Sequence, residues 1–188
     1  MQKLTAVVLG TIALGLAGCG GGEDAGQPAA GDVSFDRAFI DAMVPHHQAA
    51  IEMAGEAKDT GLTQPDLIKV ADDILATQQT EIDQMLAWRE EWFGSRDVGP
   101  EENALATIGV SAGEAGMEHS GMSLSTAGDV DQAFAEMMIE HHEGAVTMAR
   151  IAQGRADHDE IVGLAGEIIA AQEREIDVMR PHAEGAHG

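Results

Sequence analysis

One segment of the chain occurs twice, and this repeat restricts the possible folds more than any other feature. The shared positions of the first copy recur 95 residues later in the second: Asp36, Phe39, Met43, His46, His47 and Met53 return as Asp131, Phe134, Met138, His141, His142 and Met148. The residues between these positions differ. Because Met and His are uncommon and both bind metals, a repeat that keeps them indicates metal coordination as well as packing.

The spacing within each copy predicts a helix. Steps of three, four and seven residues place the repeated side chains on one face. A second repeated stripe lies further along each half, with an offset of 94 residues: Gln78, Glu81, Ile82 and Met85 return as Gln172, Glu175, Ile176 and Met179. Between the two stripes of the first half, Gly61 suits a helix C-cap and Pro65 a first helical position. Helices are therefore expected over about 35–58, 66–93, 130–155 and 158–179. Two matched helical hairpins predict an all-α four-helix bundle with approximate twofold symmetry.

The N-terminus is typical of a bacterial lipoprotein signal. Lys3 precedes an apolar run over 4–16, which ends in Leu16-Ala17-Gly18-Cys19. Cleavage before Cys19 would leave a lipidated cysteine and hence a membrane anchor, whereas an ordinary secretory signal with an incidental cysteine is the alternative. We expect a signal peptide at 1–18, a flexible tether at 19–33, the duplicated bundle at 34–183 and a tail at 184–188. A long crossover at about 94–128 joins the hairpins, and within it only 103–108 could form a short helix.

The composition limits the partners and the chemistry. With 33 acidic and 10 basic residues, the chain has a net charge of −23 and no basic face for nucleic acid. Such a surface concentrates cations. Cys19 is the only cysteine, so the mature domain has neither a disulfide nor a thiolate ligand. The sequence also lacks a Gly-rich phosphate loop, a nucleophile elbow and a Cys–His pair.

The repeated Met and His residues favour a soft metal. A di-iron carboxylate bundle would carry Glu-x-x-His motifs, but Met43 and Met138 stand three residues before the leading histidines. Thioether sulfur in that place favours Cu(I), with Cu(II) accessible through imidazole and carboxylate. The candidate metal ligands are Met43, His46, His47, Met53, Met85, Met138, His141, His142, Met148 and Met179. Weaker candidates are Asp36, Glu81, Asp131, Glu175, Met117, His119, Met122 and His182, of which His182 is expected to be solvated.

These motifs resemble the bacterial family called domain of unknown function 305, whose members have ferritin-like helical bundles. The resemblance covers about 34–181. Some similar proteins are associated with extracytoplasmic copper binding and copper tolerance, so the resemblance implies that role here. We therefore predict a lipid-anchored, extracytoplasmic copper-binding protein that sequesters copper or delivers it to, or receives it from, another protein, rather than an enzyme. The alternatives are a structural or interaction module in which Met and His belong to the core, and a ferritin-like metal-dependent oxidase. The sequence leaves the oligomeric state open.

Overall fold

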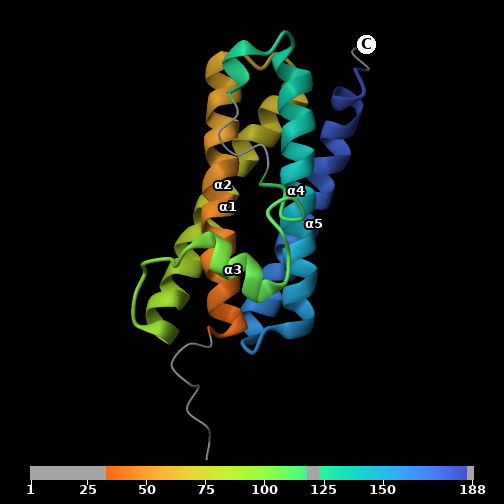
Figure 1. The fold of residues 1–188 in the computed structure, drawn as a ribbon. Coiled ribbons are helices and arrows are strands. Elements are labelled where there is room, and N and C mark those ends of the chain that lie inside the picture. The colour runs from red at the N-terminus through yellow and green to blue at the C-terminus, as the bar shows by residue number, and fades with distance from the viewer. Residues whose placement is uncertain (1–32, 118–122, 186–188) are drawn as a thin grey trace, which may run out of the picture. The chain divides into compact units, whose positions relative to one another are not determined.

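The computed structural model describes residues 33–117 and 123–185, and this part of the chain is helical and contains no strand. The predicted signal peptide and the tether up to residue 32, including Cys19, lie outside the described residues. The elements are α1 (Phe35–Thr60), α2 (Pro65–Phe93), α3 (Glu101–Ile108), the 3₁₀ turn η1 (Leu124–Thr126), α4 (Val130–Arg155) and α5 (Asp159–Ala183) (Figure 1).

Local sequence signals set several helix ends. The Ser34 hydroxyl caps α1 and the Asp129 carboxylate caps α4, each by accepting a bond from a backbone N–H three residues later. Gly61 ends α1 with a φ of 119°, a left-handed conformation that favours glycine, and Pro65 occupies the first position of α2. The predicted C-cap at Gly61 and the predicted helix start at Pro65 are therefore confirmed.

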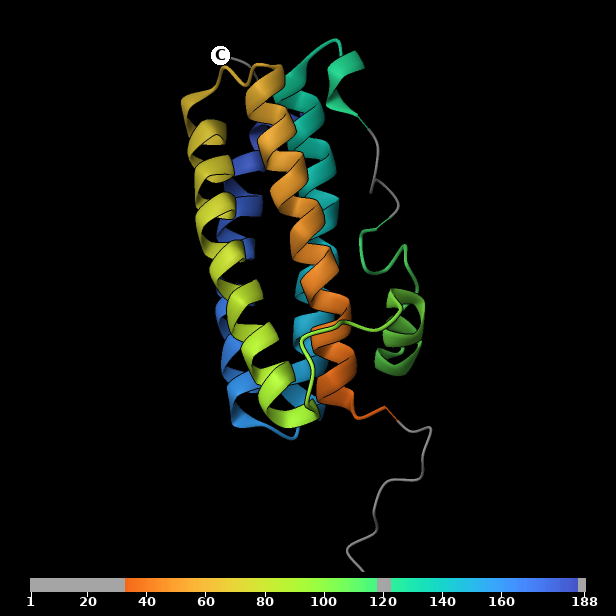
Figure 2. The same cartoon turned by 90° about the vertical axis from the view of Figure 1, so that its left-hand side faces the viewer.

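The long helices form a bundle of two hairpins. Helix α1 packs against α2 in one hairpin and α4 against α5 in the other, while α1 also contacts α4 and α2 contacts α5. Helices α1 and α4 run antiparallel (Figure 1). The helical bundle is as expected. The described residues contain five α-helices, because the short helix that the sequence allowed at 103–108 forms as α3 and buries Ala104, Leu105 and Ile108 against the core. Figure 2 shows α3 outside the long helices, on the side of α1.

The connection between the hairpins is fixed at several points. Near its start, the buried Arg89 guanidinium donates to the Ser95 carbonyl oxygen. Near its end, the Glu56 carboxylate of α1 accepts a bond from the Leu124 backbone N–H at 3.0 Å. Between these points, Ala115 is fully buried against the bundle. The described crossover therefore follows a defined path over α1 and α4.

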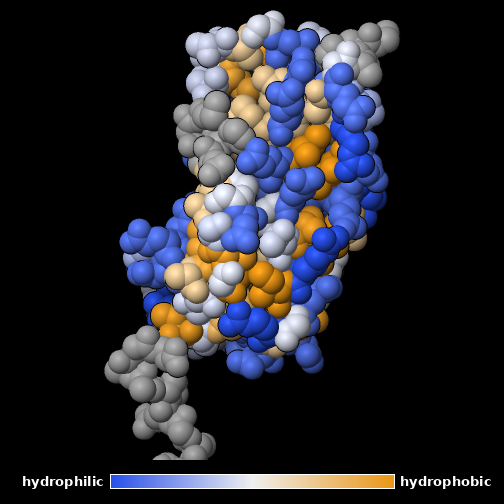
Figure 3. All heavy atoms as spheres, turned by 45° about the vertical axis from the view of Figure 1, so that its right-hand side comes forward, coloured by the Kyte–Doolittle hydropathy of each residue, from blue (hydrophilic) through white to orange (hydrophobic). Residues whose placement is uncertain are grey.

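The visible molecular face is mainly hydrophilic, with apolar side chains in interrupted patches (Figure 3). None of the described helices is long and apolar enough to cross a membrane.

Candidate metal centre

Four imidazole rings from α1 and α4 meet inside the bundle. The centroids of His46 and His141 are 3.7 Å apart, with the rings tilted by 35°. His47 lies 6.3 Å from His46, and His142 lies 6.4 Å from His141, again between ring centroids. All four residues are at most 1% exposed. The two copies of the repeat therefore face each other through their histidine pairs.

The outer two histidines each bind a glutamate of the partner helix in the same hairpin. His47 Nε2 donates to Glu81 Oε2 at 2.7 Å, and His142 Nε2 donates to Glu175 Oε2 at 2.7 Å. These carboxylates are partly exposed, with side-chain exposures of 16% and 14%. Each half of the molecule thus links a buried imidazole to a carboxylate that reaches the surface.

The inner two histidines differ because the crossover accepts a hydrogen bond from the ring of only one of them. His46 Nε2 donates to the backbone carbonyl oxygen of Ala115 at 2.9 Å. Two glycines permit this close approach of the crossover to α4. A Cβ atom at Gly144 would lie 2.1 Å from the Ala115 carbonyl oxygen, and one at Gly116 would lie 2.4 Å from the Glu140 carbonyl oxygen. The crossover therefore covers the histidines and breaks the symmetry of the repeat.

Five buried ring nitrogens in this cluster form no hydrogen bond with any described residue: Nδ1 of His46, His47 and His142, and both ring nitrogens of His141. A buried polar atom without a partner costs about 1–3 kcal/mol, and such atoms are few in folded proteins. Their concentration in one cluster is therefore unusual for a structure stabilised by protein contacts alone.

Burial keeps the two inner imidazoles neutral. Desolvation, with repulsion from His47 and His142, lowers the pKa of His46 to about 3, and the Ala115 hydrogen bond only partly offsets this. The pKa of His141 is well below its ordinary value, chiefly through burial and then through the neighbouring histidines. A neutral imidazole retains a lone pair, which is the form that ligates metals.

Six of the predicted methionine ligands divide between two hydrophobic core clusters, three in each, and we call these two sets the methionine trios. Met43, Met85 and Met148 belong to one buried core cluster, and Met53, Met138 and Met179 to the other. Each methionine of one trio corresponds, through the sequence repeat, to a methionine of the other trio. Within a trio, two methionines come from one hairpin and the third comes from the second hairpin. All six side chains are at most 6% exposed. The structure therefore distributes the predicted thioethers evenly between two equivalent parts of the core.

The donor set suits a soft cation. Thioether sulfur selects Cu(I), and imidazole also suits copper, whereas magnesium sites rely on oxygen ligands and di-iron bundles on carboxylates. Among residues 33–117 and 123–185, no group of three or more His, Cys, Asp or Glu side chains has a metal-binding arrangement.

Two of the weaker candidates, Asp36 and Asp131, have a different structural setting. Asp131 of α4 accepts bonds from the backbone N–H groups of Thr63 and Gln64, in the turn of the other hairpin. Asp36 of α1 likewise accepts from the backbone N–H groups of Asp157 and His158 at 3.0 and 2.9 Å. Each aspartate thus fastens one hairpin to the turn of the other, a role that the sequence analysis missed.

The expectation that His182 is solvated is wrong. His182 is 9% exposed, and its Nε2 donates to Asp66 Oδ2 at 2.8 Å. Helix α5 continues beyond Met179 through Pro181 to Ala183, and this extension carries His182 against the start of α2. The bond from His182 is also the main cause that lowers the pKa of Asp66.

Of the predicted loop site, Met117 is partly buried against the core cluster that contains Met43, whereas His119 and Met122 lie outside the described residues. The Ala115 carbonyl and Gly144 were not among the site residues predicted from the sequence. A backbone acceptor has no sequence signature, but a glycine within an otherwise periodic helix can signal a close backbone approach.

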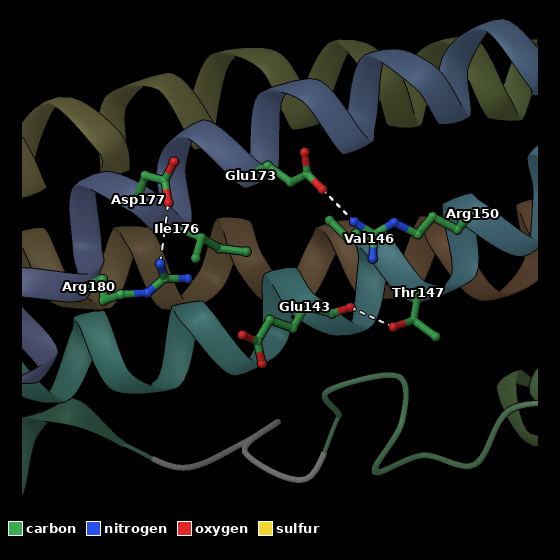
Figure 4. Close-up of a pocket in the computed structure, with 8 residues that line it drawn as sticks. All are labelled: Glu143, Val146, Thr147, Arg150, Glu173, Ile176, Asp177 and Arg180. Atoms are coloured by element: carbon green, nitrogen blue, oxygen red, sulfur yellow. Dashed lines mark hydrogen bonds and ion pairs between the residues drawn. The ribbon is translucent and has the colours of Figure 1, made fainter.

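A charged groove of about 540 Å³ lies between α4 and α5, and none of the predicted metal ligands lines it (Figure 4). Arg150 and Glu173 form an ion pair across this groove, and Arg180 and Asp177 form another along α5 (Figure 4). The groove is thus distinct from the histidine cluster.

Comparison with known proteins agrees with the fold. A family model described as Domain of unknown function (DUF305) matches residues 36–183. The Cu(I)-bound form of a protein called CopM is 30% identical, with a TM-score of 0.64, and the match covers 81% of this chain and 98% of that chain. CopM also has Ag-bound and Cu(II)-bound structures with the same TM-score of 0.64; these are 32% and 30% identical and cover 81% of this chain, and 98% and 97% of their own.

A DUF305 protein from Streptomyces coelicolor is 27% identical, with a TM-score of 0.66, and the match covers 78% of this chain and 90% of that chain. No curated protein matches the sequence. Since the family model spans most of the sequence, the chain belongs to the DUF305 family.

Proposed function

We propose that this protein binds copper inside its helical bundle, preferentially as Cu(I), and sequesters or delivers it. The ligands would come from the four clustered histidines and the two methionine trios. The observation that carries the proposal is the set of five buried ring nitrogens without hydrogen bonds in the part of the chain that the structure describes. A bound soft metal would satisfy some of these lone pairs and offset their desolvation.

The relatives support the choice of metal. CopM has been described with Cu(I), Cu(II) and Ag bound, and it is similar to this chain over nearly its whole length. Cu(I) and Ag(I) favour sulfur and imidazole, which are the donors gathered here. Glu81 and Glu175 add carboxylate oxygen close to the outer histidines, so Cu(II) is a second expected form.

The main alternative is a helical module in which these side chains only fill the core. The burial of all six methionines in the two core clusters favours this reading, because Met commonly fills irregular helical interiors. A ferritin-like oxidase is the other alternative, and it would require bound iron and turnover.

Competition against a Cu(I) chelator tests the proposal. One variant would carry Met43→Leu, His46→Gln and His47→Gln, and its matched partner Met138→Leu, His141→Gln and His142→Gln. Leu conserves the volume of Met, and Gln retains hydrogen-bonding groups, so each set should preserve helicity. Each variant should lose part of the copper capacity, and the combined variant should lose nearly all of it. Unchanged capacity, or loss of folding without a specific loss of copper, would support the core-filling alternative; tight iron binding with turnover would support the oxidase.

We further propose that the protein works outside the cytoplasm, attached to the envelope membrane by lipid on Cys19. The support is the signal-like N-terminus, together with the description of the Streptomyces coelicolor relative as a secreted protein. Mass spectrometry of the protein purified from the cell envelope should find Cys19 as an acylated first residue. An unmodified Cys19, or a mature chain that starts elsewhere, would refute the anchor.

A further inference from the structure

The geometry points to one defined tautomer for three of the four clustered histidines. We infer that His46, His47 and His142 carry their proton on Nε2 and would offer Nδ1 to the metal, with Glu81, Glu175 and the Ala115 carbonyl as the groups that position them. The ligand half of this inference rests on the proposed copper binding, whereas the tautomer half concerns the metal-free protein and stands independently.

The two glutamates act as acceptors. An ionised carboxylate can only accept hydrogen bonds, so the 2.7 Å contacts require a proton on Nε2 of His47 and on Nε2 of His142. Because both contacts recur with the same atoms and the same length, the duplication preserves this arrangement as a unit.

The third acceptor comes from the backbone. The Ala115 carbonyl oxygen, 2.9 Å from His46 Nε2, is also only an acceptor, so it fixes the proton of His46 on the same nitrogen. Thus the crossover holds His46 in the same tautomer that the glutamates impose on the outer pair.

The opposite tautomer would be doubly unfavourable. A proton on Nδ1 would become a buried donor that has no acceptor among the described residues. At the same time, Nε2 would turn a lone pair toward a carboxylate or carbonyl oxygen. With the proton on Nε2, the Nδ1 atom is instead a bare lone pair, and it is the one nitrogen of each ring still available for coordination.

His141 is the exception. Neither of its ring nitrogens forms a well-aligned hydrogen bond in the described structure, and only the nearby backbone of His46 acts on the ring, whereas His46 itself donates to Ala115. The two inner histidines are therefore chemically inequivalent despite their equivalent positions. None of the acceptors that fix the other three rings fixes the tautomer of His141.

Long-range ¹H–¹⁵N spectra of the purified, metal-free chain test the tautomers directly. His46, His47 and His142 should each show a protonated Nε2 and an unprotonated Nδ1. A proton on Nδ1 of His47 or His142 would overturn the inference, whatever the protein binds. This spectrum needs no variant, so the result does not depend on the folding of any mutant.

Cu(I) is diamagnetic, and addition of the ion to the same sample should shift the Nδ1 resonances while the Nε2 protons remain. Glu81→Gln should give His47 mixed tautomers and leave His142 unchanged, because an amide can donate as well as accept. Glu175→Gln is the matched control, with the reverse pattern. Each change should weaken Cu(I) binding about 10–100-fold.

Coordination through Nε2 would refute the ligand half of the inference. Correct tautomers without any copper binding would refute the proposed function and the ligand half together, while supporting the role of the glutamates and Ala115 in the metal-free protein.

Discussion

The imidazole of His46 lies on that of His141, at a centroid separation of 3.7 Å, although the two residues are 95 positions apart. Only the ring of His46 forms a well-aligned hydrogen bond in the described structure, and its acceptor is the Ala115 carbonyl oxygen. A buried imidazole pair in which three of the four ring nitrogens form no hydrogen bond is poorly suited to stabilising a core.

His141→Leu should stabilise the metal-free protein and abolish its stabilisation by copper. The change removes two buried nitrogens without partners and replaces them with an apolar side chain, so the free energy of unfolding should rise by about 1–2 kcal/mol. Urea denaturation with and without Cu(I) measures both effects. His142→Leu is the matched control on the same helix, and it should destabilise the protein because Glu175 loses its partner. If His141→Leu destabilises the metal-free protein, the ring contributes to the core through contacts that outweigh its unpaired nitrogens.

Acid should destabilise the metal-free protein at a pH where most carboxylates are still ionised. The pKa of His46 is lowered to about 3, and that of His141 is also lowered, so the unfolded chain binds more protons than the folded one once the pH falls below about 6.5. The contribution of these two histidines to the free energy of unfolding is thus fully present above the ordinary histidine pKa and is lost as the pH falls toward 3. Well below pH 6.5 the slope from His46 should approach about 1.4 kcal/mol per pH unit, and His141 should add a contribution of the same sign.

Thermal unfolding between pH 7 and pH 5 measures this slope. The double variant His46→Gln/His141→Gln should show a much weaker dependence, since both titrating groups are absent. A wild-type protein that becomes more stable from pH 7 to pH 5 would contradict the assignment of these rings as neutral.

Gly144→Ala should displace the crossover from the histidines. The new Cβ atom would lie 2.1 Å from the Ala115 carbonyl oxygen and 2.6 Å from the Gly116 nitrogen, so the backbone at 115–116 has to move and His46 loses its acceptor. Overpacking of this kind should lower the free energy of unfolding by about 1–3 kcal/mol.

Gly154→Ala is the matched control in the same helix, because nothing lies within 4 Å of its added Cβ. It should raise stability by about 0.5–1 kcal/mol through the better helix propensity of Ala. Equal gains for both substitutions would mean that the crossover does not rest on α4 at Gly144.

The repeat predicted the long helices and the faces that meet, because helical periodicity places Met43, His46 and their copies on one stripe. That His46 and His141 lie against each other is consistent with this repeat, because the packing of α1 on α4 brings matched stripes together. Gly61 and Pro65 marked a turn for local steric reasons that hold in any fold.

The remaining features depend on contacts between segments that no local pattern specifies. The crossover has no periodicity, so its path over His46 could not be foreseen. Asp36 and Asp131 look like possible ligands in sequence, and only the arrangement of the hairpins shows that each meets the turn of the other. His182 was expected to be solvated because it stands near the end of the chain, but α5 extends far enough to bury it against Asp66.

Asp131→Asn should weaken the bundle without affecting copper binding. The substitution removes the charge and one acceptor oxygen from a carboxylate that bonds the backbone N–H groups of Thr63 and Gln64. Hydrogen bonds to charged groups contribute about 1.5–3 kcal/mol, and we expect a loss of unfolding free energy in that range. Chemical denaturation and Cu(I) titration of the same sample separate the two roles. Glu52→Gln, at an exposed position of α1, should change neither quantity. A selective loss of copper affinity in Asp131→Asn would restore Asp131 as a candidate ligand.

Arg89→Met should be among the most damaging single substitutions outside the histidine cluster. Arg89 is 2% exposed; its Nε donates to Asp41 Oδ1 at 2.5 Å, and its Nη1 donates to the Ser95 carbonyl oxygen at 2.6 Å. The single change leaves the buried Asp41 carboxylate with only the longer contact to Arg37 at 3.6 Å, and loss of the Arg89 partner should cost about 3–5 kcal/mol.

The double variant Asp41→Leu/Arg89→Met should regain most of that loss, because replacement of both partners removes the unpaired charge and leaves apolar side chains of similar size. Urea denaturation of the wild type, both single variants and the double variant gives the coupling energy between the two residues. If the double variant loses as much as the two single changes added together, the ion pair is not what holds α1, α2 and the start of the crossover in place, and the Ser95 contact or the packing of the arginine side chain would be the dominant restraint.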